Sequence, residues 1–174
     1  SPTEFELRGT GSPEGVVTAP VGTYYTDTAI TNGAMRWAKM SGSGNTGWKV
    51  TVGDTGWRDV RSLLLNGWTA TAFQIRRRND TVMVKSDRLT GNATFLNVMS
   101  APTGFAPIQA TYHLGRESYL TGNMFAFAVA FGVIGNSWSK MVDGTWNNAT
   151  YTLIMDFDYS VEVNWPTTLP GVAA

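Results

Sequence analysis

Cysteine is absent from this sequence of 174 residues, and histidine occurs once, at His113. The absence of cysteine excludes disulfide bonds, thiolate nucleophiles and cysteine-bound metals. A single histidine is too few for a multi-histidine zinc site, and no Gly-x-Ser-x-Gly nucleophile motif accompanies it. We therefore expect a structural or surface role for His113. We also expect the fold to be stabilised by packing or by contacts with other copies of the chain.

Charge is scarce as well: charged residues make up 15% of the sequence, and 13 basic residues balance 13 acidic ones. A phosphate backbone or an anionic membrane selects an excess of positive charge, which this chain lacks. The only basic cluster is Arg76, Arg77 and Arg78, which Asn79 and Asp80 follow at once. Because neighbouring side chains in a strand point to alternating faces, we interpret this cluster as a solvated strand. We predict no nucleic-acid partner.

The sequence has no apolar run long enough to cross a bilayer. The longest run, residues 124–134, is too short and contains Gly132, so it predicts a buried strand. No basic and apolar secretion signal precedes it at the N-terminus. We predict no membrane insertion, and because the chain begins at Ser1 rather than at methionine, we expect it to be a fragment of a longer protein.

Glycine and aromatic residues are plentiful, with 19 glycines and an aromatic content of 12%, and this composition favours a β-rich protein. Residues 34–40 and 48–52 alternate between apolar and polar side chains, which predicts two strands. The Gly- and Ser-rich residues 41–47 between them predict a hairpin loop. We expect residues 1–66 to form a small N-terminal collar through which the chain trimerises.

This region contains a short sequence repeat: Asn-Thr-Gly-Trp ends at Trp48, and the similar Asp-Thr-Gly-Trp ends at Trp57. Each copy has turn residues before its tryptophan. We assign Trp37, Trp48 and Trp57 to packing. The spacing of Trp57, Val60 and Leu64 fits either one helical turn or a bent strand.

Residues 67–174 consist of short apolar stretches separated by turn residues, which predicts an antiparallel β-sandwich of the jelly-roll kind. The stretches 73–77 and 82–85 flank an Arg-Asn-Asp-Thr turn and predict a hairpin. Residues 102–107 carry two prolines and predict a rigid crossing. Further strands are expected at 108–114, 125–134, 151–157 and 159–163. The predicted fold class is all-β.

Four segments stand out together: residues 11–27 (GSPEGVVTAPVGTYYTD), a Trp-x-Lys element at Trp37 and Lys39, the Thr-Gly-Trp of residues 46–48, and the closing residues 165–171. They give the chain a resemblance to bacteriophage tail fibres, tailspikes and minor tail proteins. It covers about the first third of the chain and its end. The resemblance implies a homotrimeric receptor-binding tip on the virion, outside the cell at the host surface. It transfers no catalytic residue.

Residues 135–148 combine two tryptophans with amide, hydroxyl and acidic side chains. An indole face stacks on the apolar side of a sugar ring while amides and carboxylates pair with its hydroxyls, so this mixture suits a host glycan. Alternatively, each tryptophan anchors its loop to the core or to a neighbouring copy. The predicted ligand-binding residues are Asn136, Trp138, Asp143, Trp146 and Asn147.

Asp156 and Asp158 alternate with Phe157, so both carboxylates should lie on one face of a strand, with Glu162 shortly after them. Such a pair is compatible with a glycosidase or depolymerase, or with part of a calcium site. A half-exposed strand reads the same way, and no complete calcium loop is present. We therefore expect a binding protein that is not an enzyme and has no cofactor or metal. A host glycan or protein is its expected partner, and a purely structural fibre segment remains an alternative.

Overall fold

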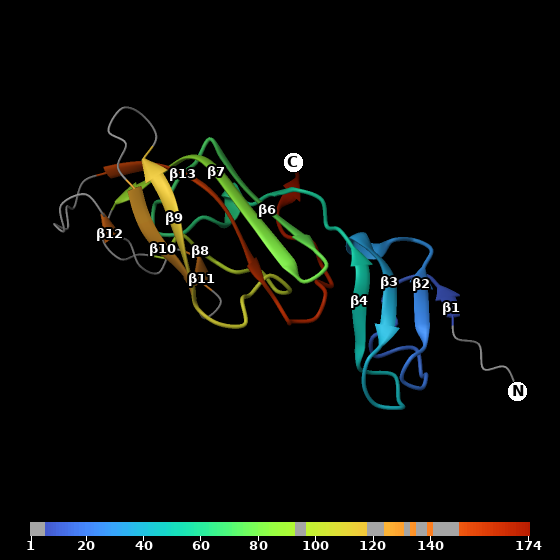
Figure 1. Ribbon diagram of the computed structural model, residues 1–174. Coiled ribbons are helices and arrows are strands. Elements are labelled where there is room, and N and C mark those ends of the chain that lie inside the picture. The colour runs from blue at the N-terminus through green and yellow to red at the C-terminus, as the bar shows by residue number, and fades with distance from the viewer. Residues whose placement is uncertain (1–5, 93–96, 118–123, 131–132, 135–138, 141–149) are drawn as a thin grey trace, which may run out of the picture.

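The computed structural model describes residues 6–92, 97–117, 124–130, 133–134, 139–140 and 150–174, and it confirms the all-β prediction. The strands form two sheets that lie side by side along the long direction of the molecule (Figure 1). The only helical segments among the described residues are two 3-10 turns, η1 (Thr31–Gly33) and η2 (Arg61–Leu63). None of the described helices has the length and apolar character needed to span a bilayer.

The smaller sheet has four strands in the order β1-β2-β3-β4. Their bounds are β1 Glu6–Gly9, β2 Tyr24–Asp27, β3 Ala34–Lys39 and β4 Trp48–Gly53. β1 pairs with β2 in parallel, and the other two pairings are antiparallel. β3 and β4 form the hairpin that the alternation in residues 34–52 predicts.

Buried Lys39 stabilises the loop of this hairpin through hydrogen bonds to the loop backbone. Its ammonium group donates to the carbonyl oxygen of Gly44 at 2.8 Å and to that of Thr46, and it lies 5.7 Å from the ring centre of Trp48. Gly47 has a positive φ of 92°, and a Cβ there would clash with the carbonyl oxygen of Ser41. Glycine is therefore required at the point where the loop enters β4.

The core of the small sheet is built from aromatic residues, as predicted for Trp37 and Trp48. Tyr25 packs edge-on against Trp48 with ring centres 6.0 Å apart. The last large member comes from far along the chain, since Trp165 packs into the same core. The buried apolar residues that pack together in this cluster are Ala19, Tyr25, Ala34, Trp37, Trp48 and Trp165.

The larger sheet has ten strands, and every pairing in it is antiparallel. Their order is β14-β5-β6-β7-β13-β9-β10-β11-β8, and β12 pairs with β10. The bounds are β5 Arg58–Asp59, β6 Ala72–Arg78, β7 Thr81–Asn92, β8 Met99–Ser100, β9 Thr111–Glu117, β10 Met124–Ala130, β11 Val133–Ile134, β12 Ser139–Lys140, β13 Thr150–Ser160 and β14 Val172–Ala173. β6 and β7 form the hairpin predicted around Asn79.

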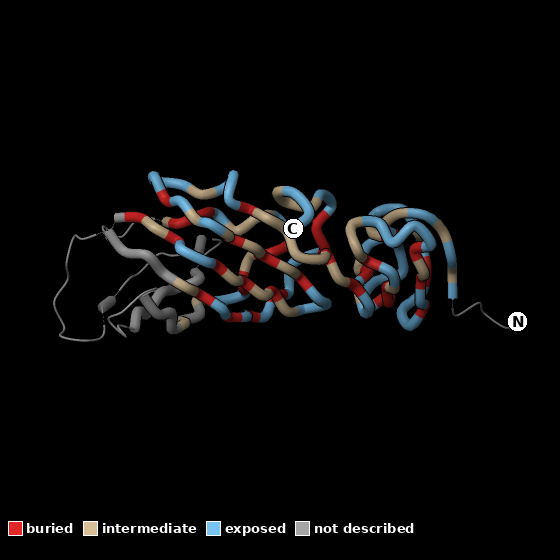
Figure 2. Tube along the Cα trace, turned by 90° about the horizontal axis from the view of Figure 1, so that it is seen from above, coloured by how far each residue is buried: buried red, intermediate tan, exposed pale blue. Residues whose placement is uncertain are grey.

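Alternation sets the core of this sheet, and Figure 2 shows buried positions alternating with intermediate or exposed ones along its central strands. Phe73 and Ile75 of β6 point inward with Met155 of β13. Met99 of β8, at one end of the strand order, belongs to the same cluster, so the sheet curls until β8 shares a core with the central strands. The phenol of Tyr159 donates to the Phe105 carbonyl oxygen at 2.8 Å, and burial raises the pKa of Tyr159.

The change from one sheet to the other falls between Gly53 and Arg58, earlier than the boundary expected near residue 66. Val60 is fully buried in the core of the larger sheet, and its N–H donates to the Phe73 carbonyl oxygen at 2.9 Å. The stretch that fitted either a helical turn or a bent strand contains both a short strand, β5, and the 3-10 turn η2. This stretch packs with the larger sheet because its apolar side chains, Val60 and Leu64, are buried in or against the core of that sheet.

Candidate functional site

All five predicted ligand-binding residues lie outside the described residues: Asn136, Trp138, Asp143, Trp146 and Asn147. The structure therefore places none of them. The candidate site must be built from other side chains.

Asp156 and Asp158 are both exposed on β13, while Met155, Phe157 and Tyr159 between and beside them are buried. This is the half-exposed strand that the sequence alternation allowed. Within the described part of the chain, no three acidic, histidine or cysteine side chains gather in a way that could hold a metal ion. The pair has the geometry of an outer sheet face.

His113 of β9 is partly buried and packs on Phe157, with ring centres 4.4 Å apart and the planes tilted by 31°. Burial lowers the pKa of the imidazole, and the nearby charge of Asp158 opposes this effect. This ring contact gives His113 the structural role expected from the sequence.

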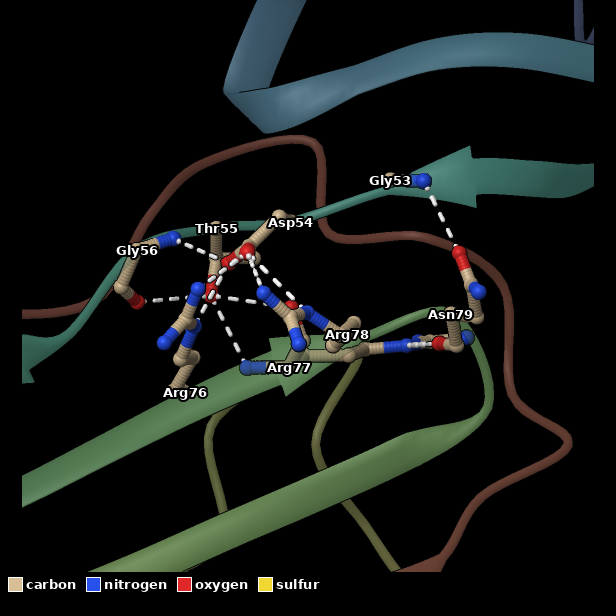
Figure 3. Close-up of polar contacts among 8 residues, drawn as sticks. All are labelled: Gly53, Asp54, Thr55, Gly56, Arg76, Arg77, Arg78 and Asn79. Atoms are coloured by element: carbon tan, nitrogen blue, oxygen red, sulfur yellow. Dashed lines mark hydrogen bonds and ion pairs between the residues drawn. The ribbon is translucent and has the colours of Figure 1, made fainter.

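The three consecutive arginines of β6 lie where the two sheets meet, and Figure 3 shows their partners. Arg76 and Arg78 point to one face and both pair with Asp54, in the link after β4. The Asp54 carboxylate accepts from Arg76 Nε at 2.8 Å, from Arg78 Nε at 3.2 Å and from the Gly56 N–H at 2.9 Å. The hydrogen bond from Arg76 contributes most to lowering the pKa of Asp54 to about 2.

Arg77 points to the opposite face, as the alternation predicts, but it is only 3% exposed, which differs from the solvated strand expected for this cluster. Its guanidinium lies 4.9 Å from the ring centre of Trp165. It donates to four carbonyl oxygens at 2.6 to 3.0 Å, those of Asn79, Gly104, Val163 and Asn164. Asp80 is its nearest carboxylate, at 3.9 Å. Backbone carbonyls, and not a close ion pair, therefore compensate for this buried charge.

The segment after β13 is fastened to the small sheet. The Trp165 indole N–H donates to the Asn32 carbonyl oxygen at 3.0 Å, and the Asn32 side-chain amide donates back to the Thr167 carbonyl oxygen at 2.6 Å. On the other side, Gly104 lies so close to Pro166 that an added Cβ would come within 2.8 Å of it. Both sheets thus hold the same segment.

A cavity of about 350 Å³ lies at this junction, beside Trp165 and the Arg77 anchor. Lys49, at its mouth, donates to the Glu162 carbonyl oxygen at 3.1 Å. Six residues characterise the cavity: Trp48 and Val50 of the small sheet, Arg77 and Asp80 of the β6–β7 hairpin, and Glu162 and Trp165 of the C-terminal segment. Two cations, Lys49 and Arg77, and two carboxylates meet here, while the rings of Trp48 and Trp165 are almost wholly buried. We refer to it as the junction cavity.

The junction cavity was not predicted from the sequence. Its residues come from three separate segments of the chain, and no spacing in the sequence relates Trp48 to Trp165. The only available signal was the pair of tryptophans itself. Trp165 was noted solely as part of a resemblance at the end of the chain.

Comparison with known proteins identifies no relative: no protein-family model, no curated protein and no solved structure matches this chain.

Proposed function

We propose that this chain is the distal tip of a bacteriophage tail fibre, a homotrimeric adhesin on the virion that binds a host cell-surface receptor outside the cell. The receptor is a glycan or a protein, and the chain binds it without chemical conversion. The observation that carries the proposal is the amount of apolar surface left exposed on the small sheet.

Seven of the twelve exposed large apolar side chains in the described part of the chain lie between residues 16 and 52. Val16 is 75% exposed, and Met40 is 61% exposed. The seven are Val16, Val21, Tyr24, Ile30, Met35, Met40 and Val52. Water-exposed apolar side chains concentrated in one small region are typical of an interface.

A four-stranded sheet of this size buries little apolar area by itself, and it has no disulfide to stabilise it. Contacts with symmetry-related copies would bury the exposed side chains of every copy equally. Three copies is the number that the tail-fibre resemblance implies. The small sheet is then the collar of the trimer, and the larger sheet is its receptor-binding head.

We further propose that the head is a jelly-roll-like sandwich. The inward side chains of β6, β7 and β13 share one core with β8 and with Phe105 of the loop that follows it, which is the packing of two facing layers.

Light scattering on the intact chain tests the assembly. We expect three times the chain mass of 18.9 kDa, and a compact monomer would contradict the trimer. Met35→Ser and Met40→Ser should dissociate the trimer because they remove apolar surface from the collar. Ile108→Ser, at an exposed position of the head, is the matched control and should leave the mass unchanged.

A glycan array combined with an assay for released reducing sugar tests the activity. Binding without release supports the adhesin. If reducing sugar is released, and if Asp156→Ala and Asp158→Ala abolish the release, the result supports a depolymerase instead. Neither binding nor release, on glycans or on host cells, supports a purely structural fibre segment.

A further inference from the structure

We propose that the trimer closes through one specific contact, in which Val16 of each copy enters a groove on the next copy. The inference rests on the proposed trimeric adhesin and identifies the two surfaces that meet in it. The groove lies between the small sheet and the β6–β7 hairpin and has a volume of about 380 Å³. We refer to it as the collar groove. Its apolar lining is Ile30, Met35 and Val52, and its polar lining includes Asp54, Arg78 and Asn79.

The exposed apolar side chains of the collar lie at the two ends of the small sheet. The loop of residues 41–47 joins β3 to β4 at one end, and β4 reaches Gly53 at the other end. The N–H of Gly15 donates to the Asn45 carbonyl oxygen at 2.8 Å, so the turn of residues 13–17 lies at the loop end. The exposed apolar side chains are Val16, Val21, Tyr24 and Met40 at the loop end, and Ile30, Met35 and Val52 at the Gly53 end.

A closed ring of three copies needs two different surfaces on each chain. In three-fold symmetry one patch meets a different patch of the next copy, whereas a two-fold axis makes both copies use the same patch. Apolar surface at both ends of the small sheet meets this need. The strands of the small sheet run across the long direction of the molecule (Figure 1), so a ring of sheets joined end to end lets the three heads extend along its axis.

Val16 is held in a fixed position although it is 75% exposed. The Glu14 carboxylate accepts from the Trp48 N–H at 2.8 Å. The Asn45 side-chain amide donates to the Gly15 carbonyl oxygen at 2.7 Å. These bonds fasten the turn to the hairpin of the small sheet, so a partner does not have to order Val16 when it binds.

Ile30 has an unusual backbone conformation at the wall of the collar groove. Its φ of 52° and ψ of 46° are left-handed, which is a rare conformation for a β-branched residue. Its side chain is 51% exposed, so core packing within the chain does not offset the strain. Strain of this kind is typical of positions that contact another molecule.

The polar groups of the groove already have partners within the chain. Asn79 Oδ1 accepts from the Gly53 N–H at 2.9 Å, and the Asp54 carboxylate pairs with Arg76 and Arg78 (Figure 3). The occupant therefore has to supply apolar surface and not hydrogen-bonding groups. A valine side chain meets this requirement.

The charges of the two surfaces are complementary. Arg78 is 60% exposed at the rim of the groove and shares the carboxylate of Asp54 with Arg76. Two guanidinium groups on one carboxylate leave the rim with one positive charge in excess. Glu14 carries a negative charge two positions before Val16. Opposite charges beside the apolar contact favour the pairing of unlike ends.

Cysteine cross-linking tests the contact, because the chain has no cysteine of its own. Three double variants of the intact chain combine Val16→Cys with Ile30→Cys, Met35→Cys or Val52→Cys. We expect at least one of them to give, on mild oxidation, a covalent trimer that a reductant returns to monomer on a denaturing gel. The length of β3, about 17 Å, separates the two ends and exceeds the reach of a disulfide within one chain.

Two controls accompany the double variants. Each single cysteine variant should remain uncross-linked, because the contact joins different positions of the two copies. Val16→Cys combined with Val172→Cys should also give no covalent trimer, since Val172 is 65% exposed but lies on β14 of the head.

Val16→Asp tests the same contact without cysteine. It places a carboxylate against the apolar lining of the groove, so the mass from light scattering should fall from three chains to one. Val172→Asp makes the same change at an exposed valine of the head and should leave the trimer intact.

Three results would overturn the proposal. A trimer by light scattering in which no double variant cross-links would place the contact elsewhere and leave the trimer standing. Cross-linking that stops at a dimer, or that continues beyond a trimer, would refute the closed ring. A monomeric intact chain would refute both this contact and the trimer of the proposed function, whose receptor binding the glycan array tests separately.

Discussion

Replacing Arg77 with methionine tests the anchor that holds the C-terminal segment and the loop after β8 against the β6–β7 hairpin. Methionine retains much of the aliphatic stem but removes the charge and every donor. The four carbonyl oxygens on the β6–β7 turn, on the loop after β8 and on the C-terminal segment then lose their partner. The contact with the Trp165 ring is lost at the same time.

The expected loss follows from two opposing terms. A buried polar group without a partner costs about 1 to 3 kcal/mol; because only the bond to Gly104 is buried and the other three are partly buried, the gross loss is about 4 to 6 kcal/mol. Removing the guanidinium also relieves its own desolvation penalty, which is several kcal/mol; burial lowers the pKa of Arg77 for the same reason. We expect a net destabilisation of about 1 to 3 kcal/mol, which corresponds to a fall in Tm of about 5 °C for a chain of this length.

Urea unfolding followed by tryptophan fluorescence measures this loss, at one fixed protein concentration because self-association shifts the midpoint. Arg77→Lys keeps the charge with fewer donors and should show an intermediate loss. Arg8→Met, in which the side chain removed is 72% exposed, is the control and should change stability by less than about 0.5 kcal/mol. An Arg77→Met protein that loses less than about 1 kcal/mol would refute the assignment of Arg77 as an anchor.

Three further predictions concern acid sensitivity, one glycine and the predicted ligand loop. The pKa of Asp54, about 2, lies below its usual value of 3.8, so Asp54 stabilises the fold above about pH 4 and this stabilisation is lost as the pH falls toward 2. Unfolding between pH 5 and pH 2 should therefore show a steeper loss for the parent than for Asp54→Asn, and parallel curves would contradict this. Gly33→Ala should lower Tm more than Gly67→Ala, because φ is positive at both but only a Cβ at Gly33 would clash with the Asp54 carbonyl oxygen; equal losses would remove the clash argument. Trp138→Ala and Trp146→Ala should weaken host-cell attachment about tenfold without lowering Tm, and unchanged attachment in both would exclude that loop.

Local patterns in the sequence were sufficient to predict the hairpins. Alternation around Trp37 and Trp48 and the Gly- and Ser-rich loop between them locate β3 and β4. Alternation also places Asp156 and Asp158 on the exposed face of β13. These features depend on neighbours in the chain, because each side chain's face is fixed by the two-residue period of a strand.

Long-range packing could not be predicted in the same way. Arg77 belongs to a polar run in the sequence, yet the strand period turns it inward, where carbonyls from residues 104 and 163–164 meet it. β1 pairs with β2 in parallel, with Leu7 opposite Tyr25. No local turn connects the two strands, so no turn sequence predicts this pairing. The junction cavity depends on such distant contacts.

The contact between Trp165 and the small sheet also has a consequence for the order of folding. The Trp165 and Asn32 hydrogen bond closes a loop of 133 residues, which costs about 2 kcal/mol more chain entropy than closing the hairpin of Trp37 and Val50. The hairpin can therefore form early, whereas the core beneath it is complete only after Trp165 has packed into it. On the ribosome, the core of the small sheet is completed only after Trp165 has emerged, long after the strands β1 to β4 themselves.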